Sequence, residues 1–265
     1  MNAINIKNLQ VYNAGMKKSL LDKIFFMDKI DATVFVDYGC ADGTLINFLR
    51  NLFPEFEYYG FDISEEMIQV AQNSNKEIKD NFSTNWDYIE SQIKGKKSCV
   101  ICSSIIHEIY SYGTINDVDV FWSRIFGNEF DYIVIRDMLP GKSIDRRSDI
   151  NDVSKVLKKA KKEALSNFES FWGSIENNKS LIHYFLKYRY TDNWSREVKE
   201  NYMPITREEL LSELPDNYEI TYHEHFILPF LKTKVEEDFG IELKDNTHLK
   251  LILKRVKNEG SNNIR

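Results

Sequence analysis

The chain has 265 residues, of which 42% are hydrophobic and 13% aromatic. This composition supports a sizeable buried core and excludes global disorder, and the length fits one large domain or a core domain with an insertion. No apolar run is long enough to cross a membrane and the N-terminus lacks a signal-peptide pattern, so we expect a cytoplasmic protein. Three cysteines exclude a disulfide framework, and Cys99 and Cys102 lie in an apolar strand pattern that predicts core positions.

The net charge of −6 is unevenly distributed along the chain. Residues 142–205 contain 13 Lys and Arg against 9 Asp and Glu, a charge of +4, so the rest of the chain carries −10. A cationic segment on an acidic body can attract an anionic partner such as RNA. Much of the excess lies in the run 155–162, however, and such runs are more often solvated helix faces.

Residues 1–31 precede the first predicted strand. Apolar residues from Met16 to Met27 recur at helical spacing, which predicts one or two amphipathic helices packed on the edge of a sheet.

The stretch 34–49 organises the rest of the chain. An apolar, β-branched run is followed by a small-residue turn at 39–43 and then by apolar residues at helical spacing. Strand, glycine turn and helix open a nucleotide-binding α/β unit, because a ligand can approach backbone that lacks a Cβ atom. The next apolar run ends in Asp62, where a carboxylate can accept hydrogen bonds from both hydroxyls of a ribose.

The spacing of the small residues separates two ligand classes. A dinucleotide fingerprint needs glycine at its first, third and sixth positions, whereas Gly39, Ala41 and Gly43 occupy the first, third and fifth. With Asp37 two positions earlier, the segment resembles motif I of the class I S-adenosylmethionine (SAM)-dependent methyltransferases, with alanine in place of the middle glycine. The segment 60–71 resembles motif II of the same family, G-x-D-x-S-x-x-M-x-x-x-A.

The resemblance implies a Rossmann-like α/β fold, in which helices flank a seven-stranded, mostly parallel sheet with an antiparallel last strand. It divides the chain into a SAM-binding core of 32–141 and 206–256, a helical cap insertion of 142–205, an N-terminal segment of 1–31 that is a candidate lid, and a flexible tail of 257–265. The implied cofactor is SAM, and the candidate cofactor-binding residues are Tyr12, Met16, Asp37, Gly39, Cys40, Ala41, Asp62, Ile63, Met67, Trp86, Asp87, Ser103 and Ser104.

Two of these candidates come from the part of the chain where the resemblance is weakest. The family has a short third strand followed by an acidic residue that meets the adenine amino group. Asp87 is the matching position, and Trp86 is placed to stack on a base. A surface aspartate beside a partly buried tryptophan is the alternative.

Two later apolar runs end in polar residues. His107 and Glu108 follow the first run, and Arg136 and Asp137 close the second. Because ligands bind outside the carboxyl ends of parallel strands, we predict that these residues line the site. His107 is the candidate base that removes a proton from the acceptor, with Glu108 or Asp137 orienting it, and Arg136 is a candidate substrate contact. Helix capping by Glu108 and a structural Arg–Asp pair are the alternatives.

Residues 150–205 have only helical patterns and end in an aromatic-rich segment. In the resembling family such an insertion often forms a substrate-specific cap, so Tyr188, Tyr190 and Trp194 are candidates to stack on a flat substrate, although most such rings pack helices together. His223 and His225 share one face of a later strand, but no third ligand accompanies them, and we expect no metal.

The leading hypothesis is a SAM-dependent methyltransferase that acts on a small-molecule acceptor. An RNA or tRNA methyltransferase that uses the basic, aromatic cap is the first alternative, and a non-catalytic SAM-binding module is the second. No membrane partner is expected.

Overall fold

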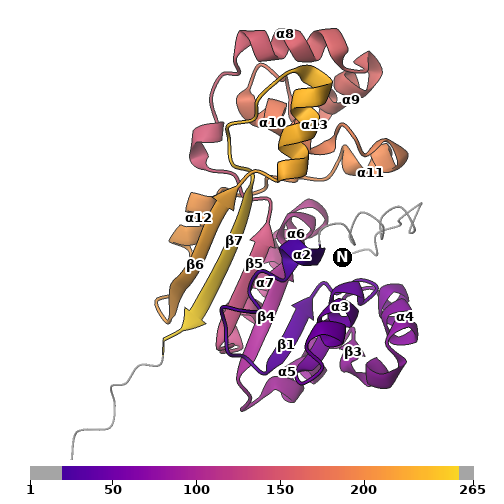
Figure 1. Cartoon of the computed structure of the whole chain (residues 1–265), viewed down its shortest axis with the longest axis vertical. Helices are drawn as coiled ribbons and strands as arrows, with labels where there is room; N and C mark the ends of the chain where they lie inside the picture. Colours follow the sequence, from indigo (N-terminus) through magenta and orange to yellow (C-terminus); the bar gives the residue numbers. More distant parts are fainter. Residues whose placement is uncertain (1–19, 257–265) are drawn as a thin grey trace, which may run out of the picture.

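The computed structural model describes residues 20–256, which form one sheet with helices on both faces (Figure 1). In this part of the chain seven strands pair in the order β3-β2-β1-β4-β5-β7-β6. The first five in this order are parallel, and β7 is antiparallel to both β5 and β6, which confirms the predicted Rossmann-like sheet. The strands are β1 (Val34–Tyr38), β2 (Glu57–Phe61), β3 (Phe82–Ser83), β4 (Ser98–Ser103), β5 (Tyr132–Asp137), β6 (Tyr218–Phe226) and β7 (His248–Arg255).

Successive side chains along the buried strands point to opposite faces of the sheet. They form two apolar layers, one on each face. In β1, Val34 and Val36 face one layer while Phe35 faces the other. The first layer packs on α5, α6, α7 and α12, and the second on α2, α3 and α4. Cys99 and Cys102 are free and fully buried, as predicted. These helices are α2 (Leu20–Lys23), α3 (Thr44–Leu52), α4 (Glu65–Ser74), α5 (Trp86–Ile93), α6 (Ile106–Tyr112), α7 (Ile115–Gly127) and α12 (Arg207–Ser212), with a 3-10 turn, η1 (Lys76–Asn81), before β3.

A second group of helices stands beyond the carboxyl ends of the strands and encloses its own apolar core (Figure 1). We call this group the cap. Its elements are η2 (Lys142–Ile144), α8 (Ile150–Lys159), α9 (Lys162–Trp172), α10 (Asn178–Lys187), η3 (Thr191–Asn193), α11 (Trp194–Glu197) and α13 (Pro229–Phe239).

The helix α13 joins the cap although it lies between β6 and β7 in the chain. Its buried residues Leu231, Val235 and Phe239 belong to the same apolar cluster as the helices of residues 150–205. The rings of Phe185 and Phe239, for example, have centroids 5.5 Å apart. The prediction placed all of 206–256 in the SAM-binding core. It did not include the helix that this segment adds to the cap.

The N-terminal helix α2 is only four residues long and is attached to the sheet by charge pairs. Asp22 contacts Arg136 on β5 at 2.7 Å and Lys250 on β7 at 2.6 Å. The next residue, Lys23, is 2% exposed. None of the helices between residues 20 and 256 combines the length and the apolar character needed to cross a bilayer.

Candidate functional site

The turn after β1 has the backbone geometry that a closely approaching ligand requires. Gly39 has φ +81°, and a Cβ atom there would lie 2.6 Å from Cδ1 of Ile105, so only glycine fits without a shift. Gly43 also has a positive φ, of +73°. Ala41, which replaces the middle glycine of the motif, adopts the left-handed region at φ +46°.

Asp62 connects this turn to the end of β2. Its Oδ2 atom accepts a hydrogen bond from the Ala41 amide at 2.9 Å, and its Oδ1 atom accepts one from the Ser64 amide at 2.9 Å. Burial raises the pKa of Asp62, although these amides oppose the shift. Each carboxylate oxygen can accept a second hydrogen bond, so Asp62 retains the capacity to bind a diol.

A pocket of about 200 Å³ opens between this turn and the helices α6 and α7. Six predicted site residues line it: Gly39, Ala41, Asp62, Ile63, Met67 and Glu108. The rest of the pocket wall was not among the predicted site residues. It is formed by Tyr38, Phe61, Ser64, Ile105, Ile109, Asp117, Val120, Phe121, Arg124 and Arg196. Helix α6 could have been suspected, because it follows the strand β4 that ends at the site, but Arg196 belongs to the cap.

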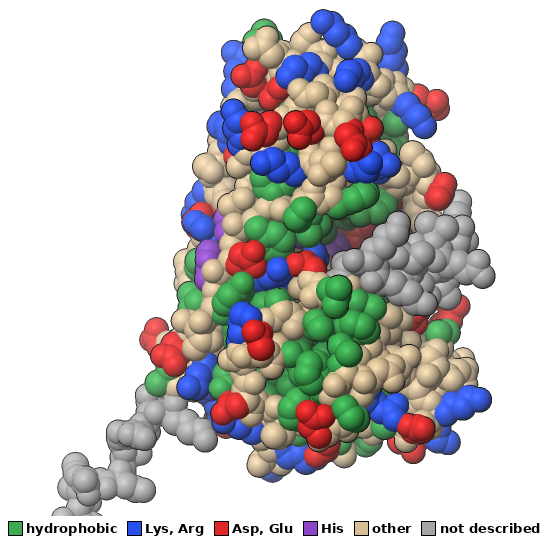
Figure 2. Space-filling view, in the orientation of Figure 1, with side chains coloured by type: hydrophobic (Ala, Val, Ile, Leu, Met, Phe, Trp, Pro, Cys, Tyr) green, Lys and Arg blue, Asp and Glu red, His purple; other side chains and the backbone are tan. Residues whose placement is uncertain are grey.

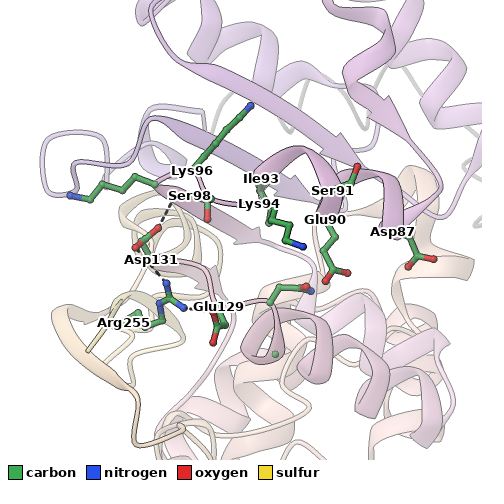
Figure 3. Close-up of a pocket in the computed structure, with 14 residues that line it drawn as sticks. Asp87, Glu90, Ser91, Ile93, Lys94, Lys96, Ser98, Glu129, Asp131 and Arg255 are labelled. Atoms are coloured by element: carbon green, nitrogen blue, oxygen red, sulfur yellow. Dashed lines mark hydrogen bonds and ion pairs between the residues drawn. The ribbon is translucent and has the colours of Figure 1, made fainter. Parts of the chain in front are cut away.

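Trp86 and Asp87 do not line this pocket, contrary to their predicted cofactor roles. Trp86 is 4% exposed and packs against Tyr38 and Phe61, with ring centroids 5.1 and 5.2 Å away, so its ring is committed to the core. Asp87 is exposed and lines a separate open groove of about 910 Å³ (Figure 3). That groove includes Ser98, at the amino end of β4, and so lies at the edge of the sheet opposite to the expected ligand edge.

The other predicted cofactor residues occupy the ends of β1 and β4. Asp37 is 5% exposed, and burial raises its pKa to about 7 even though Lys23 acts in the opposite direction. Cys40 is 4% exposed. Ser104 has φ +59° and accepts a hydrogen bond from Arg136 at 3.1 Å. Ser103 precedes it at the end of β4. The remaining two candidates, Tyr12 and Met16, lie outside the described residues.

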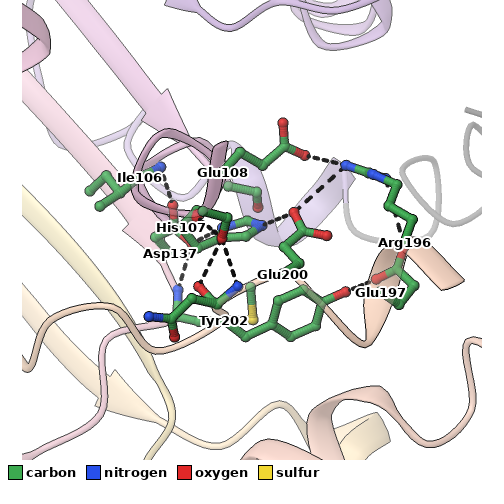
Figure 4. Close-up of polar contacts among 12 residues, drawn as sticks. Ile106, His107, Glu108, Asp137, Arg196, Glu197, Glu200 and Tyr202 are labelled. Atoms are coloured by element: carbon green, nitrogen blue, oxygen red, sulfur yellow. Dashed lines mark hydrogen bonds and ion pairs between the residues drawn. The ribbon is translucent and has the colours of Figure 1, made fainter. Parts of the chain in front are cut away.

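His107, in the first turn of α6, lies between two carboxylates (Figure 4). Its Nδ1 is 2.6 Å from Oδ1 of Asp137, and its Nε2 is 3.6 Å from Oε1 of Glu200. Burial lowers the pKa of His107, but Asp137, Glu200 and Glu108 outweigh burial and raise it to about 9. Although burial acts on Asp137 in the other direction, His107 and two backbone amides lower the pKa of Asp137.

This protonation changes the predicted role of His107. An imidazole that is to remove a proton must first be neutral, whereas a pKa of about 9 keeps the His107 ring charged at neutral pH. The predicted pairing with Asp137 is present, but it makes His107 a hydrogen-bond donor rather than a ready base.

Arg196 of α11 connects the cap to α6. Its guanidinium lies 3.2 Å from Glu108, 3.6 Å from Glu197 and 3.6 Å from Glu200 (Figure 4). Ligand-type atoms of His107, Glu108 and Glu200 come within 4.8 Å of one another, and the Arg196 guanidinium supplies positive charge to both glutamates there. Arg196 and Glu108 are 88 positions apart in the chain, so local sequence patterns could not reveal this contact.

Most of the side chains predicted to contact the substrate form hydrogen bonds with other side chains of the protein instead. Arg136 is 5% exposed and donates to Asp22, so the partner in the expected Arg–Asp pair lies on α2. The Tyr188 hydroxyl donates to Asp238 at 2.7 Å, and the Trp194 indole donates to Asn167 at 2.9 Å. The other candidate, Tyr190, is 53% exposed as a whole residue.

The later histidine pair makes contacts within the protein. His225 Nε2 lies 3.0 Å from the backbone carbonyl of Leu139, and Arg207 approaches the Nδ1 atom of the same ring at 3.4 Å. These contacts match the ordinary strand face that the sequence analysis expected.

Comparison with known proteins identifies the core. The family model described as "Methyltransferase domain" matches residues 36–162, which contain the glycine turn, Asp62 and the ends of β4 and β5. The chain therefore contains a methyltransferase domain, consistent with the class I SAM-dependent methyltransferases that its motifs resemble. It is therefore an enzyme, and its cofactor is SAM.

Solved structures share the fold of this methyltransferase. The plantazolicin methyltransferase BamL, in complex with a triazolic desmethylPZN analog and SAH, is 15% identical, with 93% of this chain and 88% of that chain covered and a TM-score of 0.50. The methyltransferase domain of bacterial CtHen1-C is 12% identical, with 91% and 99% covered and a TM-score of 0.52. The plantazolicin methyltransferase BpumL, in complex with SAH, is 14% identical, with 93% and 89% covered and a TM-score of 0.50. No match was found among curated protein sequences.

Proposed function

We propose that this methyltransferase transfers the methyl group of SAM to a small-molecule acceptor held between the carboxyl ends of the strands and the cap. The observation that carries the proposal is the position of Arg196, a cap residue that lines the pocket beside the glycine turn and pairs there with Glu108. A site closed from above by a charge pair suits a compact acceptor, and closure excludes water from the transfer.

The residues around the pocket fit SAM. The turn at Gly39 and Ala41 allows the cofactor to approach the backbone, and Asp62 would accept hydrogen bonds from the ribose hydroxyls. Ile63, which is 46% exposed, and Met67 would flank the base. The methionine portion would lie toward Cys40 and the ends of β1 and β4, where the polar residues are Asp37, Ser103 and Ser104.

Methyl transfer from a sulfonium needs alignment more than acid–base chemistry, because the leaving group is already activated. In this proposal the buried pair of His107 and Asp137 holds the start of α6, whose next residue, Glu108, lines the acceptor side of the pocket. Glu108 and Arg196 close that side, and Tyr190 is an exposed residue that could contact an acceptor.

The position of the basic residues argues against an RNA acceptor. The run 155–162 lies on α8 and the start of α9, at the end of the cap farthest from the sheet (Figure 1). Figure 2 shows Lys and Arg side chains gathered at that outer end, whereas the strand ends face the opposite side of the cap. An RNA substrate would need positive charge along the path to the pocket.

Thermal unfolding with SAM, with SAH and with NAD tests the cofactor assignment. A ligand at 100 times its dissociation constant adds about 2.7 kcal/mol to the free energy of unfolding, so SAM and SAH should raise Tm while NAD should not. In Asp62→Ala the shift with SAM should disappear, and stabilisation of that variant equal to the wild type would refute the ribose assignment. Tight, strongly salt-dependent binding of tRNA would refute the small-molecule acceptor.

A further inference from the structure

The contact between α6 and the cap contains a buried carboxylate oxygen that lacks a hydrogen bond. Glu200 is 2% exposed, and its Oε1 atom has no hydrogen-bond partner within residues 20–256. Its two ion-pair contacts, to His107 and Arg196, are both 3.6 Å long, which exceeds an ordinary N–H···O hydrogen bond. A buried oxygen in this state calls for a donor from a ligand.

Two further buried polar atoms, one of them beside this contact, share the same condition. Ser103 Oγ, at the end of β4, and Tyr112 Oη, at the end of α6, are buried and have no hydrogen-bond partner among the described residues. The Arg196 guanidinium lies 5.9 Å from the centre of the Tyr112 ring, which places Tyr112 beside the Glu108–Arg196 pair. Glu200 Oε1 and the Tyr112 ring therefore both lie beside Arg196, at the contact between α6 and the cap.

The backbone that carries Glu200 is held in place by buried contacts. Lys187, which is fully buried, donates hydrogen bonds to the backbone carbonyls of Glu197 and Glu200. The Tyr202 hydroxyl donates a hydrogen bond to the Glu197 carboxylate (Figure 4). Glu200 therefore points toward α6 from a fixed position, as a recognition residue must.

Carboxylates outnumber cations among the groups that contact one another directly around Glu200. Four carboxylates face three cations there, while Lys23 adds positive charge near Asp137 and Glu108. Burial raises the pKa of Glu200 to about 7 and lowers that of Lys187 to about 7, which shows the cost of keeping this network charged. The groups are Glu108, Asp137, Glu197 and Glu200 against His107, Lys187 and Arg196.

We propose that the methyl acceptor is an amine, which Glu200 receives as an ammonium ion and relieves of a proton before transfer. This inference rests on the proposed function. The neutral amine nitrogen then forms the new bond to the methyl carbon while the carbon–sulfur bond of SAM breaks, and both electrons of that bond go to sulfur. The products are SAH and a methylated ammonium ion, and the proton removed earlier resides on the Glu200 carboxyl.

The alternative of a hydroxyl acceptor fits these residues less well. An alkyl hydroxyl needs a strong base, and His107 already carries its proton between Asp137 and Glu200. A carboxylate is a weak base, but it is sufficient for an amine, which attacks through its own lone pair once a single proton has left.

Calorimetry with two probes of equal shape tests the proposal. Benzylamine and benzyl alcohol are titrated separately into the SAH complex of the wild type, of Glu200→Gln and of Glu176→Gln. Glu176→Gln is the matched control, because Glu176 is an exposed acid on the cap. We expect benzylamine to bind at least tenfold more tightly than benzyl alcohol to the wild type and to Glu176→Gln, and Glu200→Gln to lose this preference.

The affinity for SAH, measured first in all three proteins, distinguishes a failure of the proposed function from a failure of the amine inference. Failure of the wild type to bind SAH would refute the proposed function, whereas normal SAH binding without amine preference would overturn the amine inference alone. Retention of the preference in Glu200→Gln, or Glu200-dependent binding of Mn²⁺ in place of the amine, would also overturn it. If Glu200→Gln fails to fold, Glu200→Asp replaces it, because this variant keeps the charge on a shorter side chain. In Glu200→Asp the ratio of benzylamine affinity to benzyl alcohol affinity should fall at least fivefold.

Discussion

The two halves of the pocket are built in different ways. The half beside β1 and β2 comes from residues 37–67, where a tight turn and backbone amides position Asp62. The half beside the end of β4 depends on Arg196, a charged side chain from the cap that lines the pocket and meets Glu108 of α6 across a long stretch of chain. A backbone-built half serves an invariant cofactor, whereas a side-chain-built half can change with the acceptor while the fold stays the same.

The largest loss of stability is expected from a substitution of Asp137, beside the acceptor half of the pocket. This carboxylate is 1% exposed and accepts hydrogen bonds from His107 and from the amides of Ile106 and Met138. Asp137→Asn should lower the free energy of unfolding by about 3–5 kcal/mol, because it removes one partner of a buried pair. Asp131→Asn, at the amino end of β5, is the control and should cost about 1 kcal/mol in chemical denaturation. Equal losses in the two variants would contradict the importance of the His107 pair.

The cofactor half is tested by its glycine. Gly39→Ala should cost about 3 kcal/mol, since it combines left-handed strain with overpacking against Ile105, and it should weaken SAM binding at least tenfold. Gly173→Ala has a similar φ of +79°, with ψ 176° and no atom within 4 Å of the added Cβ, so it should cost about 1–3 kcal/mol through backbone strain alone and leave SAM binding unchanged. Similar SAM affinities in the two variants would remove the turn from the cofactor site.

The acceptor half should be the more sensitive to pH. The folded-state pKa of His107 is raised from 6.5 to about 9, so its pairing stabilises the fold fully below pH 6.5 and loses this effect as pH rises through 9. The contribution amounts to at most about 3 kcal/mol. The difference in unfolding free energy between the wild type and His107→Gln should therefore shrink between pH 6.5 and 10, and a constant difference would contradict a charged His107.

The smallest effect concerns the closing pair. Arg196→Met keeps most of the side chain's apolar volume but removes its charge. Because Arg196 is slightly exposed while its partner Glu200 is buried, the loss of stability should be about 2 kcal/mol, below that of a fully buried pair. SAH should nevertheless bind several-fold more weakly, because Arg196 lines the pocket. Arg189→Met, which breaks a pair with Asp238 within the cap, should leave SAH affinity unchanged in calorimetry. Equal SAH affinities in the two variants would show that the cap does not close over the cofactor.

The failed positions show where the sequence pattern was insufficient. Trp86 follows the third strand as the resemblance requires, yet three aromatic rings surround it in the core. An aromatic residue can satisfy a motif position or a core position, and only the packing of Phe130 and its neighbours distinguishes the two. Likewise, α13 has the pattern of an ordinary helix, and nothing in that pattern states whether the sheet or the cap buries its apolar face.

The sequence alone determined the sheet, the glycine turn and the cofactor class. These depend on local spacing, on the conformational freedom of Gly39 and on one carboxylate at the end of the next strand. The tertiary structure alone decided that His107 is charged, that Arg196 completes the pocket and that Glu200 lies behind Arg196. Burial and electrostatic pairing depend on which distant side chains meet, and a linear pattern does not contain those distances.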